Sequence, residues 1–289
     1  MTRPVKSGSQ DDARYNIRVL DRAISILSLL ADGTPRTPAE ISEAIELSPS
    51  TTFRMLSTLA YYHYVLREET TNQYRLGLAC LELAHAYLTG NDLRRISLPE
   101  LEALRNETKE TAHLAVLEGM EIVYLEKLPG LHAIGLMSSR VGGRSPAYCT
   151  GVGKVLLAYQ KLDGVRAYYQ ANGLTRYTQN TISDLAGLMS ELEAIRRVGY
   201  GFDRGEHEDE VRCVAAPIFD ITGQVVAALS ISGPEARMDP LEENYDLISM
   251  ILRAALNISR QLGYNQSKNS QKEGNHAQSH PRTPGFPRP

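Results

Sequence analysis

Short hydroxyl side chains surround one long cation between residues 48 and 58, a combination suited to binding nucleic acid. The candidate contacts, with a second arginine farther along, are Ser48, Ser50, Thr51, Thr52, Arg54, Ser57, Thr58 and Arg67. Hydroxyl groups can approach phosphates and base edges without steric bulk, and arginine can bind phosphate or guanine. The plain alternative is that Arg54 is an ordinary solvated charge.

Two short helices would have to position these residues. Thr37-Pro38-Ala39-Glu40 combines a hydroxyl N-cap, a proline at the first helical position and an acid three residues after the cap. Ser48-Pro49 starts a second helix in the same way. Its apolar residues recur three and four apart, which predicts a buried face made of Phe53, Leu56, Leu59 and Ala60.

The flanking segments complete a small domain. Residues 64–67 and 73–76 are expected to form two strands around a polar turn, which is a hairpin or wing. An upstream amphipathic helix would carry Leu20, Ala23, Ile24, Leu27 and Leu30 on one face. Three helices followed by a hairpin, in this order and spacing, predict a winged helix-turn-helix.

A second set of residues could bind a small anion. Gly151-Val152-Gly153 follows a loop and enters a predicted helix, whose first N–H groups and positive dipole end suit a carboxylate. The alternative is that these glycines only make a tight turn. Ser230 and Ser232 lie two apart on an apolar strand, so both hydroxyls point to one face. Buried hydroxyls need polar partners, which a ligand, water or the backbone would supply.

The rest of the chain predicts an α+β domain with a mostly antiparallel sheet. Helices are expected at residues 78–88, 98–109, 151–160, 163–171, 185–198 and 240–262. Strands are expected at residues 113–117, 122–127, 133–137, 201–203, 211–215 and 225–232.

Several motifs, in order over residues 16–262, resemble the IclR family of bacterial transcriptional regulators. They are Asn16-Ile-Arg-Val-Leu-Asp-Arg-Ala, Ile41-Ser-Glu-Ala-Ile-Glu-Leu-Ser-Pro-Ser-Thr-Thr-Phe-Arg-Met-Leu, Tyr74-Arg-Leu-Gly77, Gly143-Arg-Ser-Pro-Ala-Tyr-Cys-Thr-Gly-Val-Gly-Lys-Val-Leu-Leu157, Gly199-Tyr-Gly-Phe-Asp203, Val211-Arg-Cys-Val-Ala-Ala-Pro-Ile218 and Ala227-Ala-Leu-Ser-Ile-Ser-Gly-Pro234. The resemblance implies a GAF-like effector domain whose small-molecule ligand alters the binding of a double-stranded operator. It also implies homodimers, which can pair into tetramers.

The resemblance also implies which residues hold a small-acid effector. They are the helix start at Gly151 and Val152, the acid Asp203, the thiol Cys213, and the paired serines Ser230 and Ser232. The expected organisation is a flexible arm at residues 1–15, a winged helix-turn-helix domain at 16–77, a linker helix at 78–96, an effector domain at 97–262 and a disordered tail at 263–289.

The rival hypothesis is a thiol enzyme or redox sensor. Asp203, His207 and Cys213 could form a nucleophile set, with Cys149 as a resolving thiol. Against it, His207 lies in the charged run at residues 203–210, which is typical of a solvated loop. Cys213 lies within an apolar strand, where thiols are usually inert.

Composition excludes several other classes. A net charge of −3 offers no general attraction to DNA, although residues 47–67 contain no acid. An odd count of three distant cysteines favours reduced thiols in a cytoplasm. We expect no membrane segment, no metal despite the spacing of His276 and His280, and no cofactor. A phosphate-binding loop is excluded because Tyr148 stands where that motif needs a glycine. A dinucleotide-binding fingerprint is excluded because Leu156 stands where its third glycine is needed.

Overall fold

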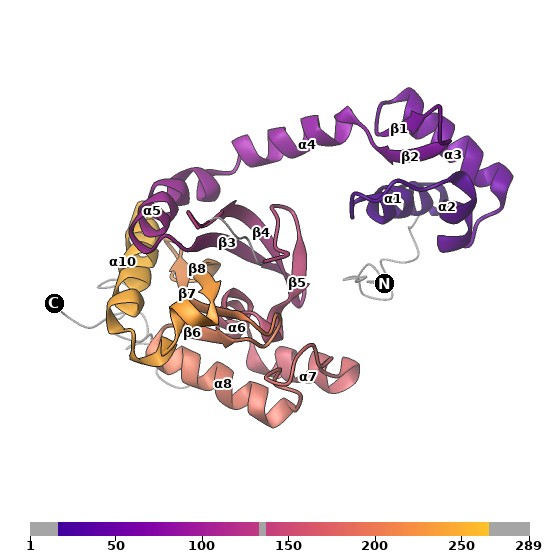
Figure 1. The fold of residues 1–289 in the computed structure, drawn as a ribbon. Coiled ribbons are helices and arrows are strands. Elements are labelled where there is room, and N and C mark those ends of the chain that lie inside the picture. Colours follow the sequence, from indigo (N-terminus) through magenta and orange to yellow (C-terminus); the bar gives the residue numbers. More distant parts are fainter. Residues whose placement is uncertain (1–16, 133–136, 266–289) are drawn as a thin grey trace. The chain divides into compact units, whose positions relative to one another are not determined.

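The structure is a computed structural model that describes residues 17–132 and 137–265 and divides into two compact units, Met1–Asn91 and Asp92–Pro289 (Figure 1). The predicted N-terminal arm, most of the predicted strand at 133–137, both C-terminal histidines and the tail from residue 266 lie outside the described residues. Within the described ranges, no helix combines the length and apolar composition needed to cross a membrane.

The first unit has the predicted order of elements. They are α1 (Arg18–Leu30), α2 (Pro38–Ala44), α3 (Pro49–Tyr61), β1 (Val65–Glu68), β2 (Gln73–Leu76) and α4 (Leu78–Thr89). The predicted helix starts are present. Thr37 and Glu40 form a reciprocal capping box at α2, and the Ser48 side chain accepts a hydrogen bond from the Thr51 amide at α3. The wing is an antiparallel pair in which Val65 faces Leu76 and Glu68 faces Gln73.

The rotation of two helices differs from the prediction. In α3 the buried residues are Thr52, Met55, Leu56 and Leu59, whereas Phe53 is 56% exposed. A spacing of three and four residues fits either of two overlapping stripes, and the structure buries the one that begins at Thr52. In α1, likewise, Ile26 and Leu30 enter the core while Leu20 and Ile24 remain exposed.

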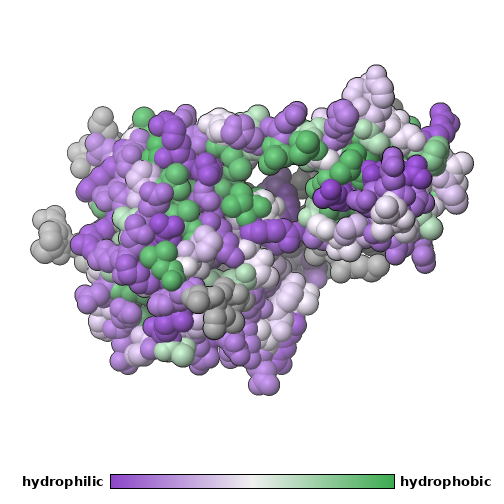
Figure 2. Space-filling model, turned by 45° about the horizontal axis from the view of Figure 1, so that its top comes forward, coloured by the Kyte–Doolittle hydropathy of each residue, from purple (hydrophilic) through white to green (hydrophobic). Residues whose placement is uncertain are grey.

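The predicted linker helix at residues 78–96 is divided in the structure. Helix α4 ends at Thr89, and the next helix begins at Asp92 in the second unit. No residue of α4 is buried, although the helix is largely apolar. Its exposed residues include Leu78, Leu81, Leu83 and Tyr87. Hydrophobic side chains accordingly come to the surface along this helix (Figure 2).

A six-stranded antiparallel sheet forms the centre of the second unit, in the order β5-β4-β3-β8-β7-β6. The strands are β3 (Thr111–Glu118), β4 (Glu121–Leu128), β5 (Arg144–Pro146), β6 (Gly201–Arg204), β7 (Val211–Phe219) and β8 (Val225–Pro234). The short edge strand β5 was not predicted. Pairing of sequence-distant β3 and β8 brings the two halves of the unit into one sheet.

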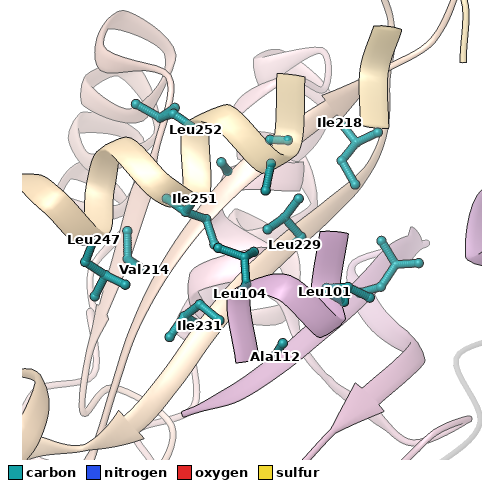
Figure 3. Close-up of a cluster of buried hydrophobic side chains, with 14 of the residues drawn as sticks. Leu101, Leu104, Ala112, Val214, Ile218, Leu229, Ile231, Leu247, Ile251 and Leu252 are labelled. Atoms are coloured by element: carbon teal, nitrogen blue, oxygen red, sulfur yellow. The ribbon is translucent and has the colours of Figure 1, made fainter. Parts of the chain in front are cut away.

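Helices cover both faces of this sheet. The helices of the unit are α5 (Asp92–Thr108), α6 (Gly151–Ala158), α7 (Leu162–Asn172), α8 (Leu185–Val198), α9 (Glu235–Met238) and α10 (Tyr245–Gln261), with short 3₁₀ turns η2 (Ala147–Cys149) and η3 (Leu241–Glu243). Helices α5 and α10 pack on one face through Leu101, Leu104 and Ile251 (Figure 3). Helices α6, α7 and α8 share the other hydrophobic cluster.

Three details of the second unit correct the prediction. The helix predicted at residues 240–262 starts later, at Tyr245, because the Asn244 side chain caps it by accepting from the Leu247 amide. The charged run at residues 203–210 is only partly solvated: Asp203 and Glu206 are buried, whereas Asp209 and Glu210 are exposed. Tyr264, assigned to the disordered tail, is buried and stacks on Phe219, with ring centroids 4.9 Å apart.

A buried ion pair fixes α6 against the turn between β6 and β7. The Lys154 side chain is 0% exposed and donates to the Glu206 carboxylate, whose side chain is 2% exposed. Lys154 Nζ also lies 3.1 Å from Glu191 Oε1 of α8. Glu191 in turn pairs with Arg204, and Arg204 with Glu242. One buried cation therefore joins α6, α8 and the β6–β7 turn.

Removing Lys154 should therefore destabilise the second unit strongly. We expect Lys154→Met to lower the free energy of unfolding by about 3–5 kcal/mol, because Glu206 would remain as a buried, unpaired charge. Urea unfolding of the full chain, followed by circular dichroism, measures the loss. The double variant Lys154→Met/Glu206→Leu should recover most of it. A single variant as stable as the wild type would contradict a buried, charged pair.

Candidate nucleic-acid interface and ligand cavity

The exposed face of α3 carries most of the predicted DNA contacts. Ser50, Arg54, Ser57 and Thr58 are exposed, Thr51 is half-buried, and Ser48 is exposed at the helix cap. The Thr58 hydroxyl donates to the Arg54 backbone carbonyl at 3.0 Å, which keeps the Thr58 side chain close to the helix. Among the described residues, no acid pairs with the Arg54 guanidinium. Apart from the ring of Phe53, which is also exposed, this face therefore consists of short hydroxyl side chains around one available cation.

Two predicted contacts have different surroundings. Thr52 is 0% exposed on the inner face of α3, so the structure contradicts its assignment as a DNA contact. Its Oγ1 has no hydrogen-bond partner in the part of the chain that the structure describes. Arg67 lies on the wing, where its Nε donates to Asn72 Oδ1 at 3.0 Å. The wing arginine is exposed but already oriented by its own turn.

The six predicted effector residues line one cavity in the second unit. Gly151 and Val152 come from α6, Asp203 from β6, Cys213 from β7, and both Ser230 and Ser232 from β8. The space in it that the centre of a water molecule can reach is about 40 Å³. The sheet register explains the meeting of the strands, since Cys213 pairs with Asp203 on one side and with Ser232 on the other.

The start of α6 offers two hydrogen-bond donors. The Thr150 side chain caps the helix by accepting from the Gly153 amide at 3.2 Å. No acceptor for the amides of Gly151 and Val152 is present among the described residues, so both remain available at the positive end of the helix dipole. A Cβ added at Gly151 would lie 2.9 Å from Cys213 Sγ. Glycine is therefore required for this close approach.

The two serines meet a buried histidine that the sequence did not reveal as a site residue. His113 on β3 pairs with Ser230 in the sheet, so their side chains share one face. His113 Nδ1 lies 3.5 Å from Ser230 Oγ and 3.4 Å from Ser232 Oγ, while its Nε2 lies 2.9 Å from Ser139 Oγ. Burial, followed by the charge of Lys127, lowers the pKa of His113 to about 3. The histidine is neutral at physiological pH.

Several further residues complete the lining. They are Tyr124, Met137, Ser139, Thr150, His207, Glu208 and Val211. The 137–139 segment is held in place by Glu208, which accepts from the Ser138 hydroxyl at 2.5 Å, and by Lys127, which donates to the Ser139 carbonyl at 2.5 Å. The sequence did not assign these residues to a ligand cavity, because strand pairing and loop packing bring them there.

Asp203 has an unusual acidity for an aspartate. Burial, followed by the negative charge of Glu206, raises the pKa of Asp203 to about 7. One carboxylate oxygen accepts a hydrogen bond from the Glu206 amide at 2.7 Å. The charge of the cavity therefore changes near neutral pH, which matters for any anion that binds there.

The thiols are poorly suited to nucleophilic chemistry. Asp203, His207 and Cys213 do line one cavity, but no hydrogen bond joins any two of these three described residues. Burial, followed by the charge of Asp203, raises the pKa of Cys213 to about 12, so the thiolate is scarce at neutral pH. Cys149 is also buried, and burial raises the pKa of its thiol. Within the described ranges, no cluster of side chains could hold a metal ion.

Comparison with known proteins identifies both domains. Residues 19–69 match the IclR helix-turn-helix domain, and residues 85–260 match the bacterial transcriptional regulator IclR C-terminal domain. The chain is 36% identical over 243 residues to the HTH-type transcriptional regulator KdgR of Escherichia coli, covering 84% of this chain and 92% of that protein.

Solved structures show the same fold. The Thermotoga maritima IclR structure is 33% identical with a TM-score of 0.68, covering 86% of this chain and all of that one. An IclR homolog from Microbacterium hydrocarbonoxydans, complexed with 4-hydroxybenzoate, is 29% identical with a TM-score of 0.73, covering 84% of this chain and 98% of that one. These relatives are regulators rather than enzymes, which removes the thiol-enzyme hypothesis. The chain belongs to the IclR family of bacterial transcriptional regulators.

Proposed function

We propose that this regulator binds a small hydroxylated carboxylic acid in the cavity of its second unit, and that this acid changes its affinity for a pseudo-palindromic operator. The observation that carries the proposal is the convergence of two free amides at the start of α6 with the hydroxyls of Ser230 and Ser232. Amides at a helix start suit a carboxylate, and the hydroxyls suit the polar end of the same molecule.

The choice of a hydroxylated acid rests on the lining. His113, Ser139 and Tyr124 add further polar atoms to the lining, while Val152, Met137 and Val211 supply apolar contact. The distances of 3.4–3.5 Å within the serine–histidine group leave these hydroxyls with weak partners. A ligand hydroxyl would satisfy them better. The 4-hydroxybenzoate complex of a relative supports the same ligand class.

On the DNA side, we propose that α3 enters the major groove and that the wing lies near the phosphate backbone. The polar face around Arg54 supports this, with Ser48, Ser50, Thr51, Ser57, Thr58 and Arg67 as the remaining contacts and Thr52 left out. Exposed apolar side chains on α1 and α4 support a homodimer, and a dimer of dimers is compatible with the same surfaces. Two copies would each take one half-site.

Replacing Arg54 should weaken operator binding. Arg54→Ala is expected to cost about 1–3 kcal/mol of specific affinity if the guanidinium binds a guanine edge. Fluorescence anisotropy with an operator selected from random DNA, and with scrambled DNA at the same salt concentration, measures the difference. Arg166→Ala, an exposed arginine on α7, is the matched control and should bind as the wild type does. Unchanged affinity in Arg54→Ala would remove Arg54 from the interface.

The cavity should be coupled to DNA binding. A thermal-shift panel of hydroxy, oxo and aromatic acids first identifies a binding acid. Calorimetric titration of the acid with and without operator should then give binding free energies that differ by about 1–3 kcal/mol. The acid should change the affinity for the operator by the same factor. Ser232→Ala and Gly151→Ala should weaken binding of the acid and leave operator binding in the absence of the acid intact. Ser183→Ala, at an exposed position, should change neither affinity. Equal affinities with and without operator would show that the cavity is no switch.

Acid binding should also depend on pH through Asp203. Below about pH 7 Asp203 is neutral, and above it the carboxylate repels an anionic ligand. We expect affinity to fall by up to about tenfold per pH unit above 7, because one proton must be taken up for each acid bound. Titration in two buffers of different ionisation enthalpy measures that proton. Asp203→Asn should abolish the dependence, and a flat wild-type profile from pH 6 to 9 would contradict it.

A further inference from the structure

Phe53 is the one aromatic side chain on the N-terminal half of α3, and it lies outside the hydrophobic core. It is 56% exposed, and it belongs neither to the cluster formed by Ile26, Ile41 and Leu56 nor to the residues packed around that cluster. No ring pair involving Phe53 occurs among the described residues. A large apolar side chain is thus available to a partner on the same face as the candidate DNA contacts.

The neighbours of Phe53 show what kind of partner this face fits. Ser50 lies three residues before Phe53 and Ser57 four residues after it, so both flank the ring on one strip of the helix surface. Arg54 is the next residue and is also exposed. Pro49 is the one exposed apolar residue next to the ring on this helix, and the other exposed neighbours are hydroxyls and a cation. This setting suits a polar surface that contains an isolated apolar group, and a hydrophobic protein interface would need more apolar area.

Resting on the proposed entry of α3 into the major groove, we propose that Phe53 determines operator sequence by contacting the methyl group of a thymine. The thymine methyl is the apolar group that base pairs present in the major groove, and phenylalanine is among the side chains that contact it. Residues near the N-terminal end of a recognition helix face the base edges. Phe53 lies in the second turn of α3, which begins at Pro49.

The position of the thymine follows from the position of Arg54. Consecutive Cα atoms are about 3.8 Å apart, and stacked bases are about 3.4 Å apart along the strand. Side chains that diverge from neighbouring backbone positions therefore reach bases that are close in sequence. Each half-site should contain a thymine within about two base pairs of the guanine that Arg54 contacts.

The test compares thymine with deoxyuridine, which lacks only the methyl group. Operators are selected from random DNA with the wild-type full-length protein, and each thymine of a half-site is then replaced in turn. At one position the wild type should lose about fourfold in affinity, the loss expected for one buried methyl group. Phe53→Ser should bind the thymine operator more weakly and show no loss on replacement at that position. Phe53→Leu, which keeps an apolar side chain, should retain part of the loss.

Tyr61→Ala is the matched control, because Tyr61 is an aromatic residue 77% exposed at the far end of the same helix. It should keep the full wild-type response to deoxyuridine. If the wild type selects no operator, the proposed function fails. If it binds an operator but no replacement matters, or if Phe53→Ser responds as the wild type does, the inference about Phe53 is overturned. A change confined to self-association in sedimentation experiments would likewise overturn it and assign Phe53 to a contact between copies.

Discussion

The arrangement of the second unit depends on one buried cation. Lys154 on α6 is surrounded by protein, and its pairing with Glu206 holds the helix start against the β6–β7 turn. Taking both charges from water costs several kcal/mol, which only close pairing and further hydrogen bonds offset. Lys154 also pairs with Glu191, and the hydroxyls of Thr178 and Thr181 hold the turn by donating to the backbone carbonyls of Gly205 and Glu206 at 2.6 Å. The two sides of the cavity are therefore fixed before any ligand arrives.

Capping and spacing rules, which involve only neighbouring residues, predicted most of the helices and strands. They failed where the rotation of a helix or a contact between distant residues decided which side chains are buried. The caps at Thr37 and Ser48 and the stop at Gly199, which has a positive φ of 83°, depend on neighbouring residues alone. Phe53 and Thr52 were assigned to the wrong faces because two overlapping apolar stripes fit the same spacing. Tyr264 was assigned to the tail because its stacking partner, Phe219, is distant in sequence.

Some residues of the cavity could likewise be predicted from the sequence, and others could not. The pattern at Ser230 and Ser232 revealed one face of one strand, and the family resemblance supplied Asp203 and Cys213. His113 could not be found from its own segment, because its role arises from pairing with a strand more than one hundred residues away. The run at residues 203–210 was expected to be solvated on account of its charge. Most of its first half is buried, including Glu206, whose charge Lys154 is placed to neutralise, while Asp209 and Glu210 remain exposed.

The contact between Gly151 and Cys213 has a consequence for how relatives of this protein could diverge. Because Cys213 Sγ would lie 2.9 Å from a Cβ at Gly151, the residue at position 213 limits the space beside the helix start that we propose binds the carboxylate. A smaller residue there would make room for a longer acid while both amides stayed in position. A larger one would close that end while the strand pairing stayed the same. In the proposed binding mode, ligand length and ligand charge are thus set by different atoms, so selection could change one without disturbing the other.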